Sequence, residues 1–243
     1  MASADSPLRI LDWDSAHFGM RIGRVTPVRA DEKLLQAALR WADEQSLDCM
    51  YLLADSSHAE TVRLAGELGW RMVDMRVTLG IEMSTAAKID SPMRLAGAGD
   101  LAYLKQLAIS SHKDSRFYTD GKFPEAACGG LFAAWIERSV HDPGFAGAVF
   151  VPEIAEGKPA GYITCALKQG AGEIGLIAVD PAARRTGLGT RLLAQATSWF
   201  AAQGADRASV VTQGCNIAAL RMYQRYGFAI ESIQLWFHWW RKR

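Results

Sequence analysis

Hydrophobic and polar positions alternate in a regular order through the carboxy-terminal half of the chain. Short apolar runs bounded by glycine, proline or polar residues predict strands, while apolar side chains at helical spacing, such as Leu192, Ala196 and Trp199, predict amphipathic helices. The expected strands cover residues 146–154, 158–168, 173–180, 207–213 and 229–240, and the expected helices cover residues 189–203 and 216–226. This order predicts an α/β fold with a mixed sheet.

The amino-terminal half repeats part of this pattern. Residues 34–70 align without a gap on residues 192–228, an offset of 158 positions, and Trp41, Asp48 and Gly69 have identical partners. Both segments show the order helix, strand, helix. We therefore expect a partial second copy of the fold in the first half of the chain.

A small, polar stretch that ends in proline, residues 84–92, is typical of a linker between the two copies. It divides the chain into a first domain of residues 1–88 and a second domain of residues 89–243. The glycine-rich turn of the second copy has no counterpart before Leu34. The first domain is therefore expected to lack the site that this turn forms.

Composition indicates an ordinary globular protein that can bury a sizeable core. The 243 residues are 49% hydrophobic and 22% charged, with no low-complexity run. A formal net charge of +1 gives no electrostatic case for binding nucleic acid or a membrane surface. The start of the chain lacks the basic and apolar regions of a signal peptide, so we expect a soluble, cytoplasmic protein.

The four cysteines lie far apart in the sequence. Cys49, Cys128, Cys165 and Cys215 form no C-x-x-C pair and have no nearby histidine at ligand spacing. This pattern argues against a structural zinc and against a disulfide framework, and it favours a reducing compartment. We expect no metal in the protein.

The sequence RRTGLG, residues 184–189, marks the point at which a predicted strand turns into a helix. Free backbone N–H groups and the positive end of the helix dipole suit a pyrophosphate at such a point. Gly187 and Gly189 let an anion approach the backbone, and Arg184 and Arg185 can add charge-assisted contacts. The motif lacks the third glycine of a Rossmann fingerprint and the G-K-[S/T] of a P-loop.

A second motif, NIAALRMYQRYGF, follows at residues 216–228. Asn216 is a strong N-cap residue, Tyr223 follows about two turns later on roughly the same helix face, and Gly227 ends the helix. Alone, Asn216 could be only a cap and Tyr223 only a core aromatic. Together with the glycine-rich turn before it, the motif favours a functional site.

The two motifs resemble those of the GNAT superfamily of acetyl-coenzyme A (acetyl-CoA) dependent N-acetyltransferases. Its [Q/R]-x-x-G-x-[G/A] turn corresponds to residues 184–189, and its N-x-x-A-x-x-x-Y-x-x-x-G-F pattern to residues 216–228. The segments LDWDSAHFG, DSRFYTDGKFP and FAAWIERSV are similar to the dTDP-fucosamine acetyltransferases of bacterial surface-polysaccharide pathways. The resemblance implies an α/β GNAT fold with a partial, degenerate amino-terminal copy.

The same resemblance implies an enzyme with acetyl-CoA as co-substrate. Its expected acceptor is the amino group of a nucleotide-linked amino sugar of the dTDP-4-amino-4,6-dideoxyhexose type. Another small amine or a protein amino terminus is the alternative within the superfamily. A non-catalytic CoA-binding module is the alternative of a different class.

The resemblance also assigns roles to residues of the second half. Tyr223 matches the family's proton donor to the leaving thiolate, a role that a phenol protonated at neutral pH can serve. The residues expected to bind acetyl-CoA are Ile177, Ala178, Val179, Arg184, Arg185, Thr186, Gly187, Leu188, Gly189, Thr190, Asn216 and Tyr223.

The general base has more than one candidate. Glu173 lies at the offset from Arg184 at which the histone-acetylating branch carries its catalytic glutamate; otherwise it is a solvated carboxylate at a strand end. His112 and Asp114 are alternatives, because their segment falls where the fold places acceptor-binding loops, although His112 could be an exposed loop residue. Arg116 could hold a phosphate of the acceptor or pair with a nearby acid. The expected acceptor-binding residues are His112, Asp114, Arg116, Phe117 and Tyr118.

The aromatic tail WFHWW predicts a strand that is covered on both faces. Trp236, His238 and Trp240 alternate with Phe237 and Trp239. We expect one face of this strand in the core, and the other in a homodimer interface or against the acceptor, with packing in the core alone as the alternative.

Overall fold

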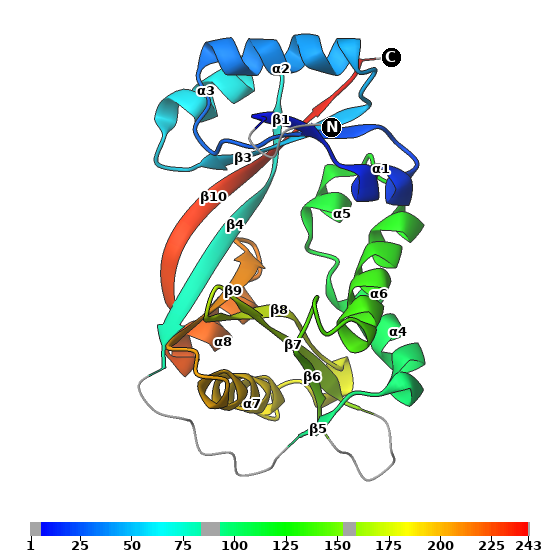
Figure 1. Cartoon of the computed structure of the whole chain (residues 1–243), viewed down its shortest axis with the longest axis vertical. Coiled ribbons are helices and arrows are strands. Elements are labelled where there is room, and N and C mark those ends of the chain that lie inside the picture. The colour runs from blue at the N-terminus through cyan, green and yellow to red at the C-terminus, as the bar shows by residue number, and fades with distance from the viewer. Residues whose placement is uncertain (1–5, 84–92, 153–158, 243) are drawn as a thin grey trace.

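A computed structural model describes residues 6–83, 93–152 and 159–242 as an α/β fold on one ten-stranded mixed sheet (Figure 1). The strand order is β1-β2-β3-β10-β4-β9-β8-β7-β6-β5. The strands are β1 (Leu8–Ile10), β2 (Ile22–Val25), β3 (Cys49–Asp55), β4 (Arg71–Glu82), β5 (Arg94–Leu95), β6 (Ala148–Val151), β7 (Gly161–Lys168), β8 (Ala171–Val179), β9 (Arg207–Gln213) and β10 (Ala229–Trp240). The predicted α/β class with a mixed sheet is confirmed.

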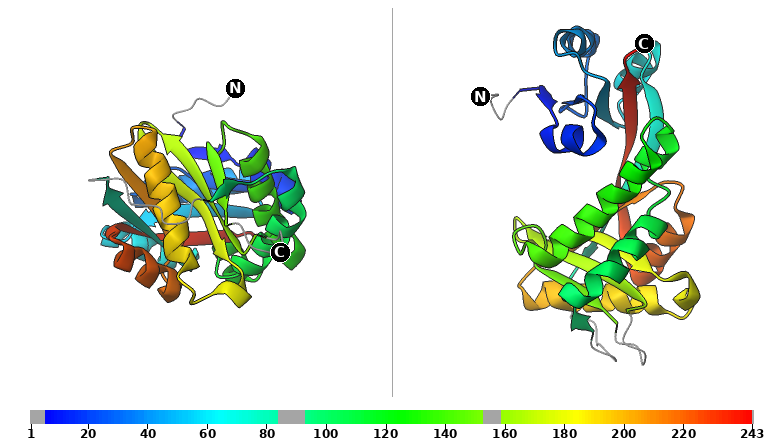
Figure 2. Two further views of the ribbon diagram at one scale, coloured as in Figure 1. Left: turned by 90° about the horizontal axis from the view of Figure 1, so that it is seen from below. Right: turned by 90° about the vertical axis from the view of Figure 1, so that its right-hand side faces the viewer.

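The helices pack against the sheet, and the apolar side chains buried between them form three hydrophobic clusters. α2 and α3 lie at the amino-terminal end, α7 at the opposite end, and α4 to α6 along one side (Figures 1 and 2). They are α1 (Asp12–Phe18), α2 (Glu32–Glu44), α3 (Ala59–Glu67), α4 (Leu101–Ser111), α5 (Arg116–Asp120), α6 (Glu125–His141), α7 (Leu188–Ala202) and α8 (Ile217–Tyr226), with short turns at Ala98–Asp100 and Pro181–Ala183. Among the described residues, no helix is both long and apolar enough to cross a membrane.

The two halves of the chain repeat the same elements at the offset found in the sequence. β3, α3 and β4 begin 158 residues before β9, α8 and β10, and each strand has the same length as its counterpart. α2 and α7 also correspond. The first half therefore contains the expected partial copy, in the order helix, strand, helix, strand.

The two copies exchange their last strands. β10 pairs antiparallel with β3 of the first copy, while β4 pairs antiparallel with β9 of the second copy. The register is the same in both strand pairs. Gln234 lies opposite Asp55, and the residues that correspond to them at the offset of 158, Arg76 and Gln213, also lie opposite each other. Between the two central strands, Arg76 lies opposite Gln234, its own counterpart, and its Nη1 donates to Gln234 Oε1 at 2.7 Å. The sheet therefore has an approximate two-fold axis at this pair.

The exchange ties the two predicted domains together. The predicted linker, residues 84–92, lies outside the described residues, so the boundary between residues 1–88 and 89–243 stays a prediction. β10 belongs to the second of these domains but lies between β3 and β4 of the first. Each half thus completes the sheet of the other.

The aromatic end of β10 is covered on both faces by this same chain. Trp236 and Trp240 pack against the cluster under α4 to α6, whereas Phe237 and Trp239 pack against the cluster under α2 and α3. Both faces of this segment therefore pack in part within the same chain, although Trp236, Trp239 and Trp240 are only half-buried, and the expectation that one face meets a second copy stays a prediction. The alternative expectation, contact with the acceptor, stays open for Trp236.

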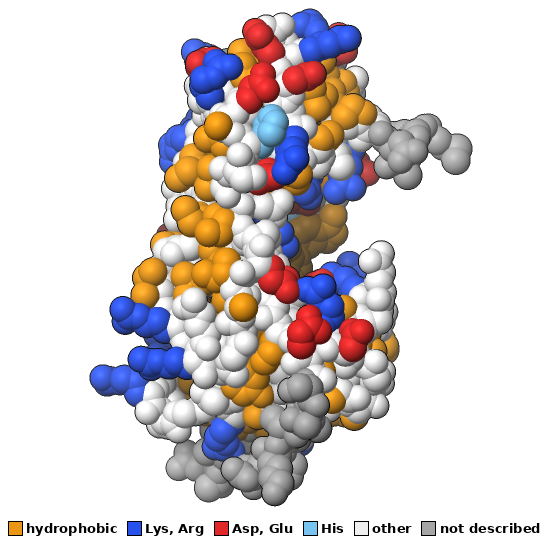
Figure 3. All heavy atoms as spheres, turned by 90° about the vertical axis from the view of Figure 1, so that its left-hand side faces the viewer, with side chains coloured by type: hydrophobic (Ala, Val, Ile, Leu, Met, Phe, Trp, Pro, Cys, Tyr) orange, Lys and Arg blue, Asp and Glu red, His pale blue; other side chains and the backbone are white. Residues whose placement is uncertain are grey.

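Figure 3 shows apolar side chains along the middle of one face of the molecule. The exposed apolar residues of the central strands include Met72 and Met75 of β4 and Ile230 and Ile233 of β10. On the same face, the surface is hollowed between the upper and lower parts of the molecule. A homodimer through this or another surface stays a prediction.

Candidate active site

The parallel strands β8 and β9 separate to form a cavity. Their pairing ends where Ile174 lies opposite Val210. A cavity of about 790 Å³ lies beyond this point, lined by residues 174–179 of β8 and residues 210–213 of β9. Side chains of β4, α5 and β10 line the same cavity, so both halves of the chain contribute to it.

A bulge in β8 shapes the cavity wall. The pairing of β8 with β7 shifts at residues 174–177, and Leu176 N donates to Thr164 Oγ1 at 2.8 Å. Gly175 is needed here, because a Cβ would lie 2.9 Å from Thr164 Oγ1. The strand then continues through residues 177–179, which line the cavity as expected for contacts to the pantetheine arm of CoA.

The turn before α7 has a backbone suited to an anion. Arg185 and Gly187 both have positive φ angles, +65° and +82°, immediately before α7 begins at Leu188. Left-handed residues at a helix start direct several backbone N–H groups into one concavity. The predicted CoA-binding residues of this turn that line the cavity are Arg184, Arg185, Gly187, Leu188, Gly189 and Thr190, whereas Thr186 is not among the lining residues and donates to Ala183 O.

Gly189 has a packing role besides the predicted approach of an anion. A Cβ at this position would lie 2.5 Å from the Sδ of Met222. Because Met222 belongs to α8, a larger residue at 189 would displace the Met222 side chain. Gly189 therefore leaves room for the side chain of Met222 between α7 and α8.

The predicted limits of α8 are confirmed. Asn216 Oδ1 accepts from Ala219 N at 3.1 Å as the N-cap, and Gly227, with φ +118°, ends the helix. Tyr223 is buried, lines the cavity and has no hydrogen-bond partner for its hydroxyl among the described residues. Burial raises the pKa of Tyr223, so the phenol is protonated at neutral pH.

Four of the five predicted acceptor residues line this same cavity, namely His112, Asp114, Arg116 and Phe117, while Tyr118 does not. His112 stacks on Phe132 with ring centroids 4.7 Å apart and shares a hydrogen bond of 3.1 Å with the Tyr162 hydroxyl. Burial lowers the pKa of His112 to about 4, so its ring is neutral at pH 7. The alternative of an exposed loop histidine is wrong.

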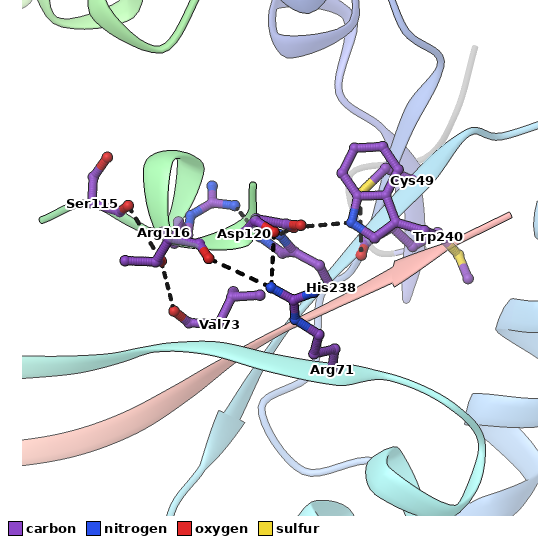
Figure 4. A network of polar contacts seen from close by, with 10 residues as sticks. Cys49, Arg71, Val73, Ser115, Arg116, Asp120, His238 and Trp240 are labelled. Carbon is purple, nitrogen blue, oxygen red and sulfur yellow. Dashed lines mark hydrogen bonds and ion pairs between the residues drawn. The ribbon is translucent and has the colours of Figure 1, made fainter. Parts of the chain in front are cut away.

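Arg116 is held by a buried hydrogen-bond chain (Figure 4). Its Nη1 lies 2.7 Å from His238 Nε2, which must accept because a guanidinium only donates. His238 Nδ1 therefore carries the proton and donates to Asp120, which also accepts from Trp240 Nε1 at 2.9 Å. Burial lowers the pKa of His238 to about 4, so the imidazole between Arg116 and Asp120 is neutral.

Three aromatic rings surround the guanidinium group of Arg116. Its Cζ lies 4.1 Å from the ring centroids of Tyr51 and Phe117 and 4.2 Å from that of Trp236. The predicted pairing of Arg116 with a nearby acid is not found among the described residues, because its close partners are a neutral histidine and three rings. Its predicted contact with a phosphate stays a prediction. The positive charge of Arg116 is thus fixed at the cavity, and no carboxylate of the described residues pairs with it directly.

Asp74 and Arg76 of β4 line the cavity, although no functional residue was expected in the first half of the chain. Burial raises the pKa of Asp74 to about 6, against the opposing effects of the Met75 backbone N–H and the charge of Arg116. No sequence motif marks these residues, because they reach the site only through the strand exchange. Asp74 is the cavity carboxylate whose pKa is best matched to proton transfer near neutral pH.

Glu173 is not among the residues that line the cavity. Its Oε1 forms an ion pair of 2.6 Å with Lys168 Nζ at the end of the β7–β8 hairpin. Its position matches the alternative of a solvated strand-end carboxylate. Its role as a base therefore rests on the sequence resemblance alone.

Residues 108–228 of this chain match the Acetyltransferase (GNAT) family. This segment contains α7, α8 and the diverging strands β8 and β9. The chain carries a GNAT family acetyltransferase domain. GNAT enzymes use acetyl-CoA as co-substrate, and the predicted superfamily and enzyme class are confirmed.

Relatives extend the similarity beyond the GNAT domain. A dTDP-fucosamine acetyltransferase of Escherichia coli O6:H1 (strain CFT073) is 29% identical over 231 residues, 94% of this chain and 96% of the relative. A mycothiol acetyltransferase of Clavibacter sepedonicus is 25% identical over 176 residues, 72% of this chain but only 54% of that protein. The crystal structure of a GCN5-related N-acetyltransferase from Sphaerobacter thermophilus has a TM-score of 0.68 at 15% identity, covering 96% of this chain and 76% of that one. This last likeness shows the shared fold.

The turn of the first half that corresponds to residues 184–189 differs in charge. Asp31 occupies the position of Gly189, and its carboxylate accepts from Leu34 N at 2.8 Å as the N-cap of α2. A carboxylate at the start of a helix occupies the anion position and repels phosphate.

Within the described residues, no three potential His, Cys, Asp or Glu metal ligands lie together, and the expectation of a protein without metal stays untested.

We expect one acetyl-CoA to bind per chain, in the second half. Only that half combines a glycine turn with an uncapped helix start; in the first half, Asp31 blocks the equivalent position. Isothermal titration calorimetry with acetyl-CoA measures the stoichiometry directly. A value near two would show that the first half binds CoA as well.

Proposed function

We propose that this GNAT acetyltransferase moves the acetyl group of acetyl-CoA to the amino group of a nucleotide-linked amino sugar, of the dTDP-4-amino-4,6-dideoxyhexose type. The observation that carries the proposal is the shared cavity, in which the residues expected to bind CoA and the charged side chains of β4 and α5 line one space. Transfer between two substrates requires them to meet in such a space. The name of the E. coli relative, which matches almost the whole of both chains, supports this acceptor. The resemblance to enzymes of surface-polysaccharide pathways supports a role in polysaccharide biosynthesis.

In this proposal, acetyl-CoA lies along the splayed strands and the start of α7. Backbone groups of residues 177–179 hold the pantetheine arm, and the turn at residues 184–189 holds the pyrophosphate through backbone N–H groups and two arginines. Asn216, at the start of α8, contacts the coenzyme from the other side of the cavity. The thioester then lies near Tyr223.

Asp74 is the general base of the proposed reaction, and Tyr223 is the general acid. Asp74 accepts one proton from the ammonium group of the acceptor, and the free amine attacks the thioester carbonyl. As the C–S bond breaks, Tyr223 protonates the leaving thiolate and regains a proton from the new amide nitrogen. His112 is a weaker candidate base, because its pKa of about 4 leaves it with less affinity for the amine proton.

We expect the nucleotide-linked amino sugar to react with a kcat/KM at least about 100-fold above that of the free amino sugar, because binding energy from the nucleotide is lost with the free sugar. Release of CoA, measured across a panel of amines, tests this. The panel includes the free sugar, aminoglycosides, amino acids and a peptide amino terminus. Equal kcat/KM for the free sugar or an aminoglycoside would overturn the acceptor assignment and leave the acetyltransferase activity intact.

A further inference from the structure

Two arginines from different parts of the chain pack against Trp236, and a third lies on the same sheet face. Arg116 and Arg24 lie with their Cζ atoms 4.2 Å and 5.4 Å from the centroid of the Trp236 ring. Arg76 lies on the same sheet face as Trp236, because it pairs with Gln234, two residues before Trp236 on β10. We call Arg24, Arg76 and Arg116 the arginine cluster.

The strand order brings the arginine cluster to the cavity. Arg24 of β2 lies opposite Tyr51 of β3, which lies opposite His238 of β10. Paired residues of adjacent strands share a face, so Arg24 belongs to the face that carries Trp236 and Arg76. Trp236 and two members of the cluster line the cavity, and Arg24 lies beside them against the tryptophan ring.

The arginine cluster has positive charge that the described residues do not pair. None of its three members forms an ion pair with a described carboxylate, and Arg24 Nε is buried without a hydrogen-bond partner. Burial lowers the pKa of Arg24, and the charges of Arg9, Arg116 and Arg76 lower it further.

Nearby carboxylates offset this charge only in part. Asp14 lies close enough to affect Arg24 and Arg116, but burial raises the pKa of Asp14 itself. The charge of Arg116 lowers the pKa of Asp74, and that of Glu173 raises the pKa of Arg76, but neither carboxylate forms an ion pair with the cluster among the described residues. Burying three like charges together is costly unless an anion joins them. The cluster therefore fits a ligand with at least two negative charges.

We propose that Arg24, Arg76 and Arg116 bind the diphosphate of the acceptor, so that the first half of the chain supplies two of the three arginines that recognise the acceptor. The inference rests on the proposed function, because it requires a nucleotide-linked acceptor. Guanidinium groups bind phosphate oxygens in bidentate pairs. The amino sugar then extends from the cluster past Asp74, the neighbour of Arg76 two positions along β4, toward the thioester.

The pyrophosphate of CoA is a second source of the same chemistry, and the structure provides a separate place for it. Arg184 and Arg185 lie at the start of α7 in the second half, whereas Arg24 and Arg76 lie on β2 and β4 of the first half. Saturating the protein with CoA therefore fills one anion site and leaves the arginine cluster for the acceptor. This separation makes the two sources distinguishable.

The test is calorimetric titration of thymidine diphosphate into the CoA-saturated protein. Arg24→Met and Arg76→Met keep most of the aliphatic stem and remove the charge. Each should raise the Kd of thymidine diphosphate by about tenfold or more, because a charge-assisted contact is lost. Arg40→Met, an exposed arginine of α2, is the matched control and should leave this Kd unchanged. The Kd of CoA should be the same in all four proteins.

Thermal unfolding shows whether the variants fold. Arg24→Met should not lower Tm, because it removes a half-buried charge that forms no ion pair among the described residues, whereas Arg76→Met should lower it slightly, because the hydrogen bond to Gln234 is lost. Titration with thymidine measures the nucleoside without phosphate, and its weak binding should not change in the variants. If wild type binds thymidine diphosphate and both variants bind it equally well, the inference is wrong while the proposed function stands. If thymidine binds as tightly as the diphosphate, the inference is also wrong. If wild type binds no nucleotide and free amino sugars react as well as linked ones, both proposals fall.

Discussion

Replacing Asp74 with asparagine is expected to lower kcat by about 10²-fold to 10⁴-fold, the usual contribution of a general base, and to leave the Kd of acetyl-CoA unchanged. In wild type, kcat/KM should rise with pH and level off above about 6, because Asp74 accepts a proton only in its ionised form and burial raises its pKa to about 6. Asp74→Asn should lose this limb of the pH profile. Steady-state kinetics across pH 5 to 9 measure both effects.

Stability separates a chemical effect of Asp74→Asn from unfolding. The folded-state pKa of Asp74 lies above its unfolded value of 3.8, so the charged carboxylate disfavours the folded state at pH above about 6. The asparagine variant should therefore have a Tm at pH 8 equal to or above that of wild type. Glu173→Gln is the comparison, since Glu173 is the base expected from the family resemblance. If Glu173→Gln removes the pH limb and Asp74→Asn does not, the base is Glu173.

Tyr223→Phe is expected to lower kcat by about 10²-fold to 10⁴-fold, roughly 3 to 5 kcal/mol of transition-state stabilisation, with the Kd of acetyl-CoA and the Tm unchanged. The hydroxyl has no hydrogen-bond partner among the described residues, so its removal breaks no contact of the fold. Burial keeps the phenol protonated, which suits an acid that donates to a thiolate. Kinetics at saturating substrates and calorimetry measure the two quantities.

Tyr226→Phe is the matched control on the same helix. The Tyr226 hydroxyl bonds with Thr197 Oγ1 at 2.6 Å, and Tyr226 is not among the residues that line the cavity. Its loss should lower the free energy of unfolding by about 1 kcal/mol and leave kcat unchanged. Activity of Tyr223→Phe within about threefold of wild type would remove Tyr223 from the mechanism.

Local features of the second half could be predicted from the sequence because their physical causes are local. The Asn216 cap and the Gly227 end of α8 depend on residues within one helix. The helix start at Leu188 depends on the turn directly before it. The limits of β9 and β10 followed from apolar runs for the same reason, whereas β6 is shorter than the predicted strand at residues 146–154. The family resemblance then connected these local features to acetyl-CoA.

The acceptor side could not be predicted, because long-range pairing creates it. Asp74 lies opposite Trp236 only because β4 and β10 meet at the centre of the sheet, and no periodic pattern specifies which strands become neighbours. The contact of Arg116 with His238 depends on the same arrangement. Glu173 shows a second limit of prediction from the sequence. A bulge follows Glu173 in β8, and such an irregularity changes which residues of the strand line the cavity.

The strand exchange has a consequence for how the protein forms during synthesis. β3 and its partner β10 are about 180 residues apart in the chain, and such distant pairing is slow because a long loop must close first. Until the ribosome has released the last residues, one edge of β3 has no partner, and the nascent amino-terminal half exposes a strand edge that can join other chains. Two molecules could also complete each other by trading the final strand, since the same surfaces would pair. Concentration during refolding should therefore decide between monomers and entangled dimers.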